Sequence, residues 1–299
     1  MTKFAPRMDV VITYVDGNDP LWKEDYAKVV GGVALSKRFR DWGTLRYLLR
    51  GIGKFIPYVR KVHLVVARDS QVPSWVNREA VHVVLHKDII PEAYLPTFNS
   101  SMIEMFLHRI EGLDEQFLYF NDDMFPMRPL PEEAFFKDGK PSIGFHKVFC
   151  GGSAYKRLVF KSDALAREAL GMRQGLFAVR PQHVCSPMLR SLCEDLFGKV
   201  ERQIMDSLSP LRDKRNFNQY LFMDYMYYGG NVVAEPLSNK HFSLAASSVD
   251  RIARFIADPT ASLACINDVN MSERRFNSIK PKLLGAFESA LPEPSVYES

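Results

Sequence analysis

Residues 9–20 read DVVITYVDGNDP, a β-branched run that ends in a dense turn signal. Such a run favours a buried strand, and Asp, Gly, Asn and Pro in succession end it. Further along, FLYF at 117–120 predicts a second strand that continues directly into Asn121-Asp122-Asp123. The chain therefore has two expected strands that each end in an acidic turn.

The sequence between these two strands alternates helical and extended patterns. The apolar residues of 41–52 recur at helical spacing, which predicts a helix that Gly51 and Gly53 end. Residues 62–67 and 81–85 are short apolar runs and predict two more strands. This alternation indicates an α/β fold with a mostly parallel twisted sheet and flanking helices.

A further helix is expected to begin near Asn99, where Ser101 and Glu104 resemble a capping box. His108 lies one turn beyond Glu104, so we expect the two side chains to pair. Because ligands of such sheets bind beyond the carboxyl ends of the strands, both acidic turns lie at the edge where a site is expected.

The second half is less regular and predicts insertions in the sheet fold. Ser186-Pro187 is typical of a helix start, residues 218–228 predict another helix, and residues 150–153 predict a turn. We find no repeat or linker, so we expect a single domain over residues 1–299.

Composition describes an ordinary globular protein, with 46% hydrophobic and 25% charged residues in a chain of 299. The formal charge of +4 is too small to indicate a nucleic-acid-binding protein, and we expect no nucleic-acid partner. Arginines outnumber lysines 22 to 17, which is compatible with a phosphorylated substrate. On composition alone, a solvated surface explains this surplus better.

The expected location is cytoplasmic. The four cysteines form no C-x-x-C pair, and no apolar run reaches the ~18 residues that cross a bilayer. Residues 1–8 lack the apolar core of a signal peptide. We therefore expect no transmembrane segment, while peripheral contact with the inner face of the cell membrane stays open.

The acidic turns are the first candidates for chemistry. Asn121, Asp122 and Asp123 offer hard oxygen ligands for Mg²⁺ or Mn²⁺, although an acidic turn can simply end a strand. Asp16 could bind a ribose or a metal, and Gly17 would let the backbone approach a ligand. An ordinary Asx turn explains Asp16 equally well.

His183 is the second candidate, because it lies three residues before the expected helix start at Ser186. A helix N-terminus attracts anions, and a histidine beside a phosphate can act as a general base or bind the phosphate. The basic clusters 37–40 and 212–215 could hold a diphosphate, or they could be solvated surface. The sequence has no P-loop, dinucleotide-binding, zincin or nucleophile-elbow motif, which argues against those enzyme classes.

Several stretches together resemble the Stealth family, which includes bacterial capsular polysaccharide phosphotransferases and the eukaryotic N-acetylglucosamine-1-phosphotransferase that tags lysosomal enzymes. The similar blocks follow the family's order and cover almost the whole chain. They are DVVITYVDGNDP (9–20), RFRDWGTLRYLLRGI (38–52), QVPSWV (71–76), LPTFNS (95–100), LHRIEGL (107–113), FLYFNDDMF (117–125), RPQH (180–183) and CIND (265–268).

The resemblance implies a Rossmann-like or glycosyltransferase-A-like fold and a phosphotransferase. The enzyme would transfer hexose-1-phosphate, such as N-acetylglucosamine-1-phosphate, from a nucleotide-sugar to a hydroxyl of an oligo- or polysaccharide. A UDP-sugar is the expected donor, a nucleoside monophosphate leaves, and the product is a phosphodiester of capsular or cell-surface polysaccharide. The alternative is a metal-dependent nucleotide-sugar glycosyltransferase that releases a nucleoside diphosphate. A sugar-nucleotide or glycan-binding module without activity is the third interpretation.

The resemblance also implies roles for the candidate residues. Asp122 or Asp123, completed by Asp268, would hold Mg²⁺ or Mn²⁺. His183 would be the general base on the acceptor hydroxyl, and Arg215 would bind the transferring phosphoryl group.

The remaining implied roles concern the donor. Asp16 would bind the donor, or act as the base if His183 only positions phosphate. Arg38, Arg46, Asn99 and Asn121 are the expected substrate-binding residues.

Overall fold

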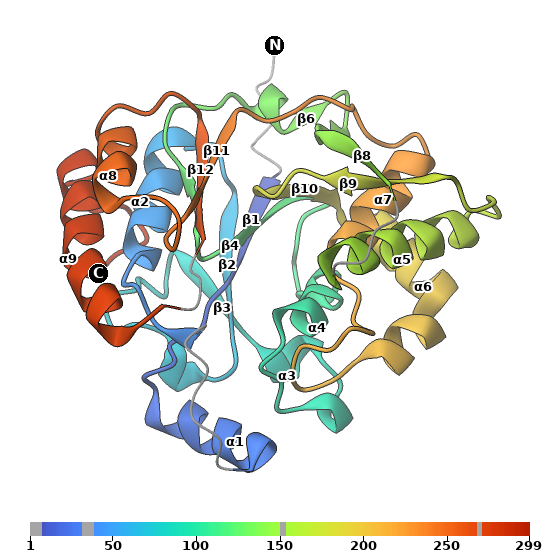
Figure 1. The fold of residues 1–299 in the computed structure, drawn as a ribbon, viewed down its shortest axis with the longest axis horizontal. Coiled ribbons are helices and arrows are strands. Elements are labelled where there is room, and N and C mark those ends of the chain that lie inside the picture. Colours follow the sequence, from blue (N-terminus) through green and yellow to red (C-terminus); the bar gives the residue numbers. More distant parts are fainter. Residues whose placement is uncertain (1–7, 32–38, 150–153, 268–270) are drawn as a thin grey trace.

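A central five-stranded sheet lies between two groups of helices (Figure 1). The computed structural model describes residues 8–31, 39–149, 154–267 and 271–299. The strand order is β10-β4-β1-β2-β3, and every neighbouring pair except β10–β4 is parallel. These strands are β1 (Met8–Thr13), β2 (Lys61–Val66), β3 (Val81–Leu85), β4 (Gln116–Asn121) and β10 (Ser186–Leu189). The predicted α/β fold with a mostly parallel sheet is confirmed.

Helices cover both faces of this sheet. On one face pack α2 (Leu45–Phe55), α8 (Val249–Ala257) and α9 (Glu273–Ala290). On the other pack α4 (Ser100–Glu104), α5 (Ala154–Ala169), α6 (Arg190–Ser207) and α7 (Tyr220–Tyr228). The short α3 (His86–Ile89) follows β3, and α1 (Pro20–Val30) lies at one end of the molecule (Figure 1). Among the described residues, no helix is both long and apolar enough to cross a membrane.

The two faces of the sheet follow from the alternation of side chains along each strand. Val10 and Ile12 of β1 are buried against the α2 side, whereas Val11 between them is buried against the α4 side. In β4, Phe120 faces the α2 side and Tyr119 the α4 side. Both faces of these central strands are therefore apolar, as expected for a sheet covered by helices on both sides.

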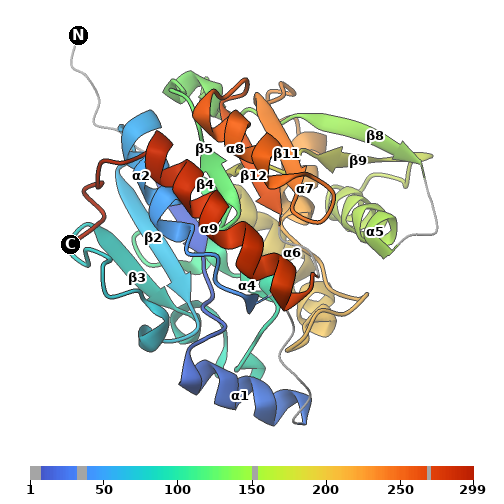
Figure 2. The ribbon, with the colours of Figure 1, turned by 60° about the vertical axis from the view of Figure 1, so that its left-hand side comes forward.

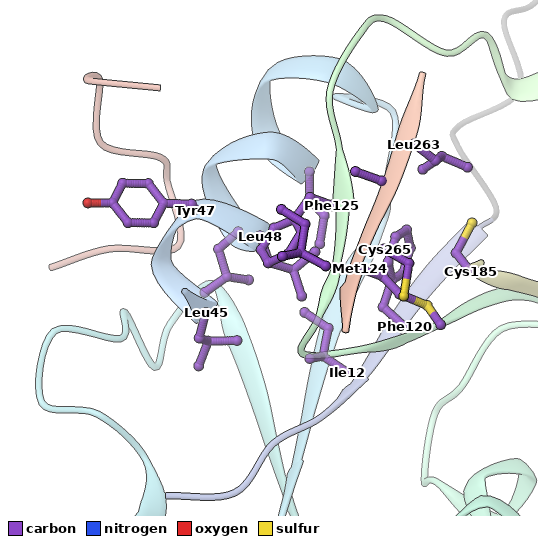
Figure 3. Packing of buried hydrophobic residues seen from close by; sticks show 14 of the residues in the cluster. Ile12, Leu45, Tyr47, Leu48, Phe120, Met124, Phe125, Cys185, Leu263 and Cys265 are labelled. Carbon is purple, nitrogen blue, oxygen red and sulfur yellow. The ribbon is translucent and has the colours of Figure 1, made fainter. Parts of the chain in front are cut away.

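A second sheet fixes the acidic turn that follows β4. β5 (Met124–Pro126) pairs with β12 (Leu263–Asn267), and β12 pairs with β11 (Asn239–Ser243), as Figure 2 shows. The register places Cys265 opposite both Met124 and His241. Phe120, Met124 and Cys265 share one buried cluster (Figure 3). The turn between β4 and β5 is thus held between the central sheet, which contains β4, and the second sheet, which contains β5.

Two short antiparallel pairs complete the strands. They are β6 (Phe136–Lys137) with β7 (Lys140–Pro141), and β8 (Phe145–Phe149) with β9 (Phe177–Pro181). Single 3₁₀ turns cover Asp69–Gln71, Glu92–Tyr94, Leu107–Arg109 and Glu132–Ala134.

The first predicted helix, at 41–52, is confirmed, but α2 begins later, at Leu45, and also ends later. α2 continues through Gly51 and Gly53 to Phe55. Gly51 serves packing instead, because a Cβ there would lie 2.8 Å from the carbonyl oxygen of Pro126. The absence of a side chain lets α2 approach β5 closely.

The predicted capping box at α4 is wrong. Asn99 caps the helix, and its Oδ1 accepts from the Ser101 N–H at 3.2 Å. Glu104 instead accepts from the Gln219 N–H at 3.1 Å. His108 does not pair with Glu104 either, because it is buried among aromatic rings.

The helix start predicted at Ser186-Pro187 is also wrong. These residues begin β10, an antiparallel edge strand where proline is tolerated, and α6 begins only at Arg190. His183 therefore does not precede a helix N-terminus. The turn predicted at 150–153 lies outside the described residues, whereas the helix predicted at 218–228 is confirmed as α7.

The strand order places the acidic turns side by side. β2 and β3 extend the sheet on one side of β1, and β4 lies on the other, so the order reverses between β1 and β4. Thr13 and Asn121 are register partners at the carboxyl ends of these strands. This reversal is the position at which open α/β sheets bind ligands.

At the opposite end of β1, a buried carboxylate connects three segments. Asp9 is fully buried and accepts from Arg60, from the His63 ring and from the Asp114 N–H at 2.9 Å. Burial by itself raises the pKa of Asp9, but the His63 and Arg60 hydrogen bonds outweigh it and bring the pKa below 3.8. The stability that Asp9 contributes is therefore present at neutral pH and lost as the pH falls through this lowered pKa.

Replacing Asp9 by Ala leaves Arg60 and His63 without their buried partner. We expect the free energy of unfolding to fall by about 3–5 kcal/mol, the usual cost of breaking a buried pair. Urea unfolding at pH 7 measures this loss. The matched control is Asp206→Asn, which removes an exposed pairing with Arg202 and should unfold like the wild type. An equal effect of both variants contradicts the prediction.

Candidate active site

A cleft of about 1280 Å³ opens where β1 and β4 end. It exceeds the ~300–1,000 Å³ of most small-molecule sites, so it has room for two substrates. Its walls come from widely separated parts of the chain. They include Thr13, Tyr14, Asp41, Glu104, Asn121, Asp122, Asp123, Arg180, His183, Arg212, His241 and Asn267.

Asp123 is held in the cleft by contacts with β12. Its backbone oxygen accepts from the Ile266 N–H at 2.8 Å, which ties the acidic turn to β12. The Cys265 thiol donates to Asp123 Oδ2 at 3.7 Å. Burial, and then the nearby Asp123 charge, raise the pKa of Cys265, so the thiol stays protonated and acts as a donor.

His183 reaches the same place from the link between β9 and β10. The preceding Gln182 fixes this link: its N–H donates to the Gly144 oxygen at 2.8 Å, and its Oε1 accepts from the Leu237 N–H at 2.9 Å. A Cβ on Gly144 would lie 2.4 Å from Gln182 Oε1, so the glycine makes room for this amide. Burial, and then Arg180, lower the pKa of His183 below 6.5. The imidazole is therefore neutral at pH 7 and able to accept a proton.

The structure thus brings together Asp123, His183 and Cys265, whose ligand atoms all lie within 4.8 Å of one another. The His241 ring centroid lies 6.1 Å from that of His183. Of the three groups, the protonated Cys265 thiol is a poor metal ligand, because metals bind the thiolate.

The carboxylates of Asp122 and Asp123 fit a divalent cation better. Both line the cleft and supply the oxygen atoms that Mg²⁺ and Mn²⁺ prefer. Asp268, the third expected ligand, lies outside the described residues.

Further negative charge surrounds Tyr14. Burial, followed by the charges of Asp41, Asp16 and Asp122, raises the pKa of this phenol. Asp41 and Asp122 line the cleft with Tyr14, whereas Asp16 is not among the lining residues. The acidic side of the cleft is therefore built by both strand ends.

The turn at Asp16 is an Asx turn, in which Oδ1 accepts from the Asn18 N–H at 2.8 Å. Gly17 donates to the Phe39 oxygen at 2.9 Å, and a Cβ there would lie 2.0 Å from that oxygen. Gly17 therefore makes room for residue 39, and the hypothesis that it lets the backbone approach a ligand is wrong.

The basic side of the cleft consists of arginines. Arg40, Arg180 and Arg212 line it, and no lysine does so among the described residues. Arg40 pairs with Glu273, and Arg212 donates to Ser100 Oγ at 2.6 Å. Guanidinium groups suit phosphate oxygens, which they bind in a bidentate manner.

Of the residues expected to bind substrate, Asn121 lines the cleft, but Asn99 and Arg46 do not. Asn99 is fully buried, and its amide donates to Asn216 Oδ1 at 2.9 Å. Arg46 stacks on Trp75 and pairs with Glu298. Both side chains therefore serve the fold, and Arg38 lies outside the described residues.

The catalytic arginine expected in the 212–215 cluster is also placed differently. Arg215 is exposed and bonded to Asp213, and it is not among the lining residues, whereas Arg212 is. Sequence reasoning identified the cluster but could not tell which member faces inward. It also missed Arg180, although Arg180 begins the RPQH motif, and His241, for which no sequence signal exists.

Residues 38–143 match the Stealth protein conserved region 2. A capsular polysaccharide phosphotransferase of Streptococcus pneumoniae is 30% identical over 98% of this chain and 99% of its own length. A receptor polysaccharide phosphotransferase of Streptococcus oralis is similar to the same extent. The chain belongs to the Stealth family. An exopolysaccharide phosphotransferase of Streptomyces coelicolor is 32% identical over 97% of this Stealth protein and 52% of its own length. The chain is accordingly an enzyme of the transferase class.

Solved structures show a weaker likeness. A galactosyltransferase crystallised with donor and acceptor sugar analogues is 11% identical, covers 94% of this chain and 96% of its own, and has a TM-score of 0.44. Likeness at this level says nothing about the reaction of the Stealth protein.

A metal-binding measurement distinguishes a site made by the Asp122 and Asp123 carboxylates from a site that includes the Cys265 sulfur. We expect Asp123→Asn to weaken Mn²⁺ binding by about 10-fold or more, because it removes a charged oxygen ligand. Cys265→Ser keeps a donor beside Asp123 and should retain the affinity. Electron paramagnetic resonance of free and bound Mn²⁺ measures both. Equal loss in the two variants would show that Cys265 is a ligand.

Proposed function

We propose that this Stealth protein transfers hexose-1-phosphate from a nucleotide-sugar, with a UDP-sugar as the expected donor, to a hydroxyl of a capsular or cell-surface polysaccharide. The observation that carries this proposal is the composition of one cleft. Carboxylates suited to Mg²⁺ or Mn²⁺, a neutral histidine and three arginines converge at the switch point of the sheet. Family membership and the names of the relatives support the same reaction class.

The proposed step is a displacement at the phosphorus that bears the sugar. The acceptor oxygen forms a bond to this phosphorus, and the bridging P–O bond breaks. Its electron pair leaves with the nucleoside monophosphate, and the hydroxyl proton passes to a base. The sugar C1–O bond stays intact, so the product is a phosphodiester between two sugars.

His183 is the proposed base. It lines the cleft, its pKa lies below 6.5, and it lies near the acidic turn. Asp16 is less suited to this role, because its carboxylate already accepts from the Asn18 N–H and is not among the residues that line the cleft. We assign Asp16 to the donor side of the cleft, next to Tyr14.

Arg180 and Arg212 are the proposed phosphate-binding groups. Both line the cleft together with His183, and their positive charges help to lower the pKa of His183. Positioned cations of this kind stabilise the charge that develops during phosphoryl transfer. Bound at Asp122 and Asp123, a divalent cation would neutralise the diphosphate charge.

We also propose that residues 1–299 act as one domain. The lining residues range from Thr13 to Leu283, so neither half of the chain supplies the cleft alone.

Products decide between the two reaction classes. With UDP-N-acetylglucosamine and a polysaccharide acceptor, the proposed phosphotransfer releases UMP and adds a phosphorus resonance to the polymer. Nucleotide chromatography and ³¹P NMR measure these products. Release of UDP, with no phosphorus in the product, would instead indicate a glycosyltransferase.

Arg212 and Arg215 lie three residues apart and provide a matched pair of variants. We expect Arg212→Met to lower kcat/KM by about 10²–10³-fold, the usual cost of removing a transition-state donor. Arg215→Met removes only an exposed pairing with Asp213 and should remain near wild type. Initial rates of UMP release measure both variants. The assignment fails if Arg215→Met loses more activity than Arg212→Met.

A further inference from the structure

Three oxygen atoms surround the buried hydroxyl of Tyr119, behind the acidic turn. Tyr119 Oη lies 2.6 Å from Asn121 Oδ1, 3.2 Å from Glu104 Oε1 and 3.0 Å from Thr13 Oγ1. Tyr119 and Glu104 are 1% and 5% exposed. No step of the proposed reaction uses Glu104, although it lines the cleft.

The hydrogen atoms of this cluster can be counted. A phenol has one hydrogen, and both an amide oxygen and an ionised carboxylate only accept. The 2.6 Å contact assigns the phenol hydrogen to Asn121 Oδ1. The geometry also suits donation from the phenol to Glu104 Oε1, but its one hydrogen cannot serve both acceptors, so the 3.2 Å contact is a hydrogen bond at the same time only when the Glu104 carboxyl group is protonated. The Thr13 hydroxyl brings its own hydrogen and changes nothing in this count.

Loss of the Glu104 proton reverses the order of donors. The phenol hydrogen would turn to the carboxylate, and Asn121 Oδ1 would face the phenol oxygen with no hydrogen between them. The Asn121 amide must then turn over, so that Nδ2 donates to Tyr119 and Oδ1 faces the cleft. Whether Asn121 presents Nδ2 or Oδ1 to the substrate therefore depends on the proton of Glu104.

We propose that Glu104 is a positioning residue whose proton, acting through Tyr119, makes Asn121 present its Nδ2 donor to the diphosphate of the nucleotide-sugar. The identity of this ligand rests on the proposed function. The hydrogen-bond order rests only on the distances above. An N–H donor facing an anion is favourable, whereas the amide oxygen in the same place repels it.

The surroundings of Glu104 favour the protonated form. Burial raises the pKa of Glu104 to about 7, whereas the Gln219 N–H, the Arg212 charge and the phenol of Tyr119, which can donate to the ionised carboxylate, act against it. Gln219 lies at the start of α7, Arg212 lies in the segment before α7, and Tyr119 lies in β4. The proton is therefore held over the acid range and lost as the pH rises through about 7.

The variant that tests this proposal is Glu104→Gln. Glutamine is neutral at every pH, its Nε2 can donate to Tyr119, and its Oε1 can accept from the Gln219 N–H. With UDP-N-acetylglucosamine, we expect the wild-type KM for the donor to rise about 10-fold between pH 6 and 9, as for one lost charge-assisted hydrogen bond. In Glu104→Gln this rise should be absent, and kcat should stay within a few-fold of wild type.

A second measurement does not depend on turnover. In ¹⁵N-labelled protein, the side-chain amide of Asn121, assigned by its loss in Asn121→Asp, should shift with pH near 7. The shift should disappear in Glu104→Gln, and in Tyr119→Phe, which keeps Glu104 but removes the link. If no donor is turned over, the proposed function fails, and this titration still decides the role of Glu104.

Two results would overturn the proposal. One is an Asn121 amide that does not titrate in wild type or still titrates in Glu104→Gln. The other is a Glu104→Gln protein that is folded by circular dichroism but inactive at every pH, because the ionised form would then be the working one.

Discussion

Parallel pairing of β1 with β4 is the constraint on which the whole cleft depends. Because Thr13 lies opposite Asn121, both acidic turns end at one level of the sheet edge. The second half of the chain is attached to this edge through β5 and β12, and the Ile266 N–H binds the Asp123 oxygen directly. The β5–β12 pairing thereby fixes Cys265 relative to Asp123, at the level of the sheet edge that the β1–β4 pairing sets.

Burial sets the protonation of the groups around this edge. It lowers the pKa of His183, raises that of Cys265 and brings that of Glu104 to about 7. His183 and Cys265 are thereby favoured in their neutral forms near neutral pH, and Glu104 changes its protonation there, while arginines and Asp122 supply the charges. A neutral base beside fixed positive charge suits an anionic donor, because the base can accept a proton while the arginines hold the phosphate.

The sequence predicted the fold well where each segment decides its own structure. Strands β1 to β4 and helix α7 follow from β-branched runs and helical spacing within a few residues. It failed at Ser186-Pro187 and at Ser101, where local cap patterns compete with tertiary pairing. Ser186 pairs with β4, and Asn99 rather than Ser101 caps α4 because the chain leaves Asn99 extended.

The candidate site also combines features that local sequence predicts with features that only tertiary contacts decide. Sequence by itself determined the two acidic turns, the basic cluster at 212–215, the histidine of RPQH and the family, because each is a contiguous pattern. Tertiary structure alone decided that Arg212 rather than Arg215 faces inward, that Asn99 and Arg46 serve packing, and that Glu104 lies behind Asn121. The physical reason is that inward or outward facing, burial and hydrogen-bond order depend on neighbours far away in the chain, which no local pattern encodes.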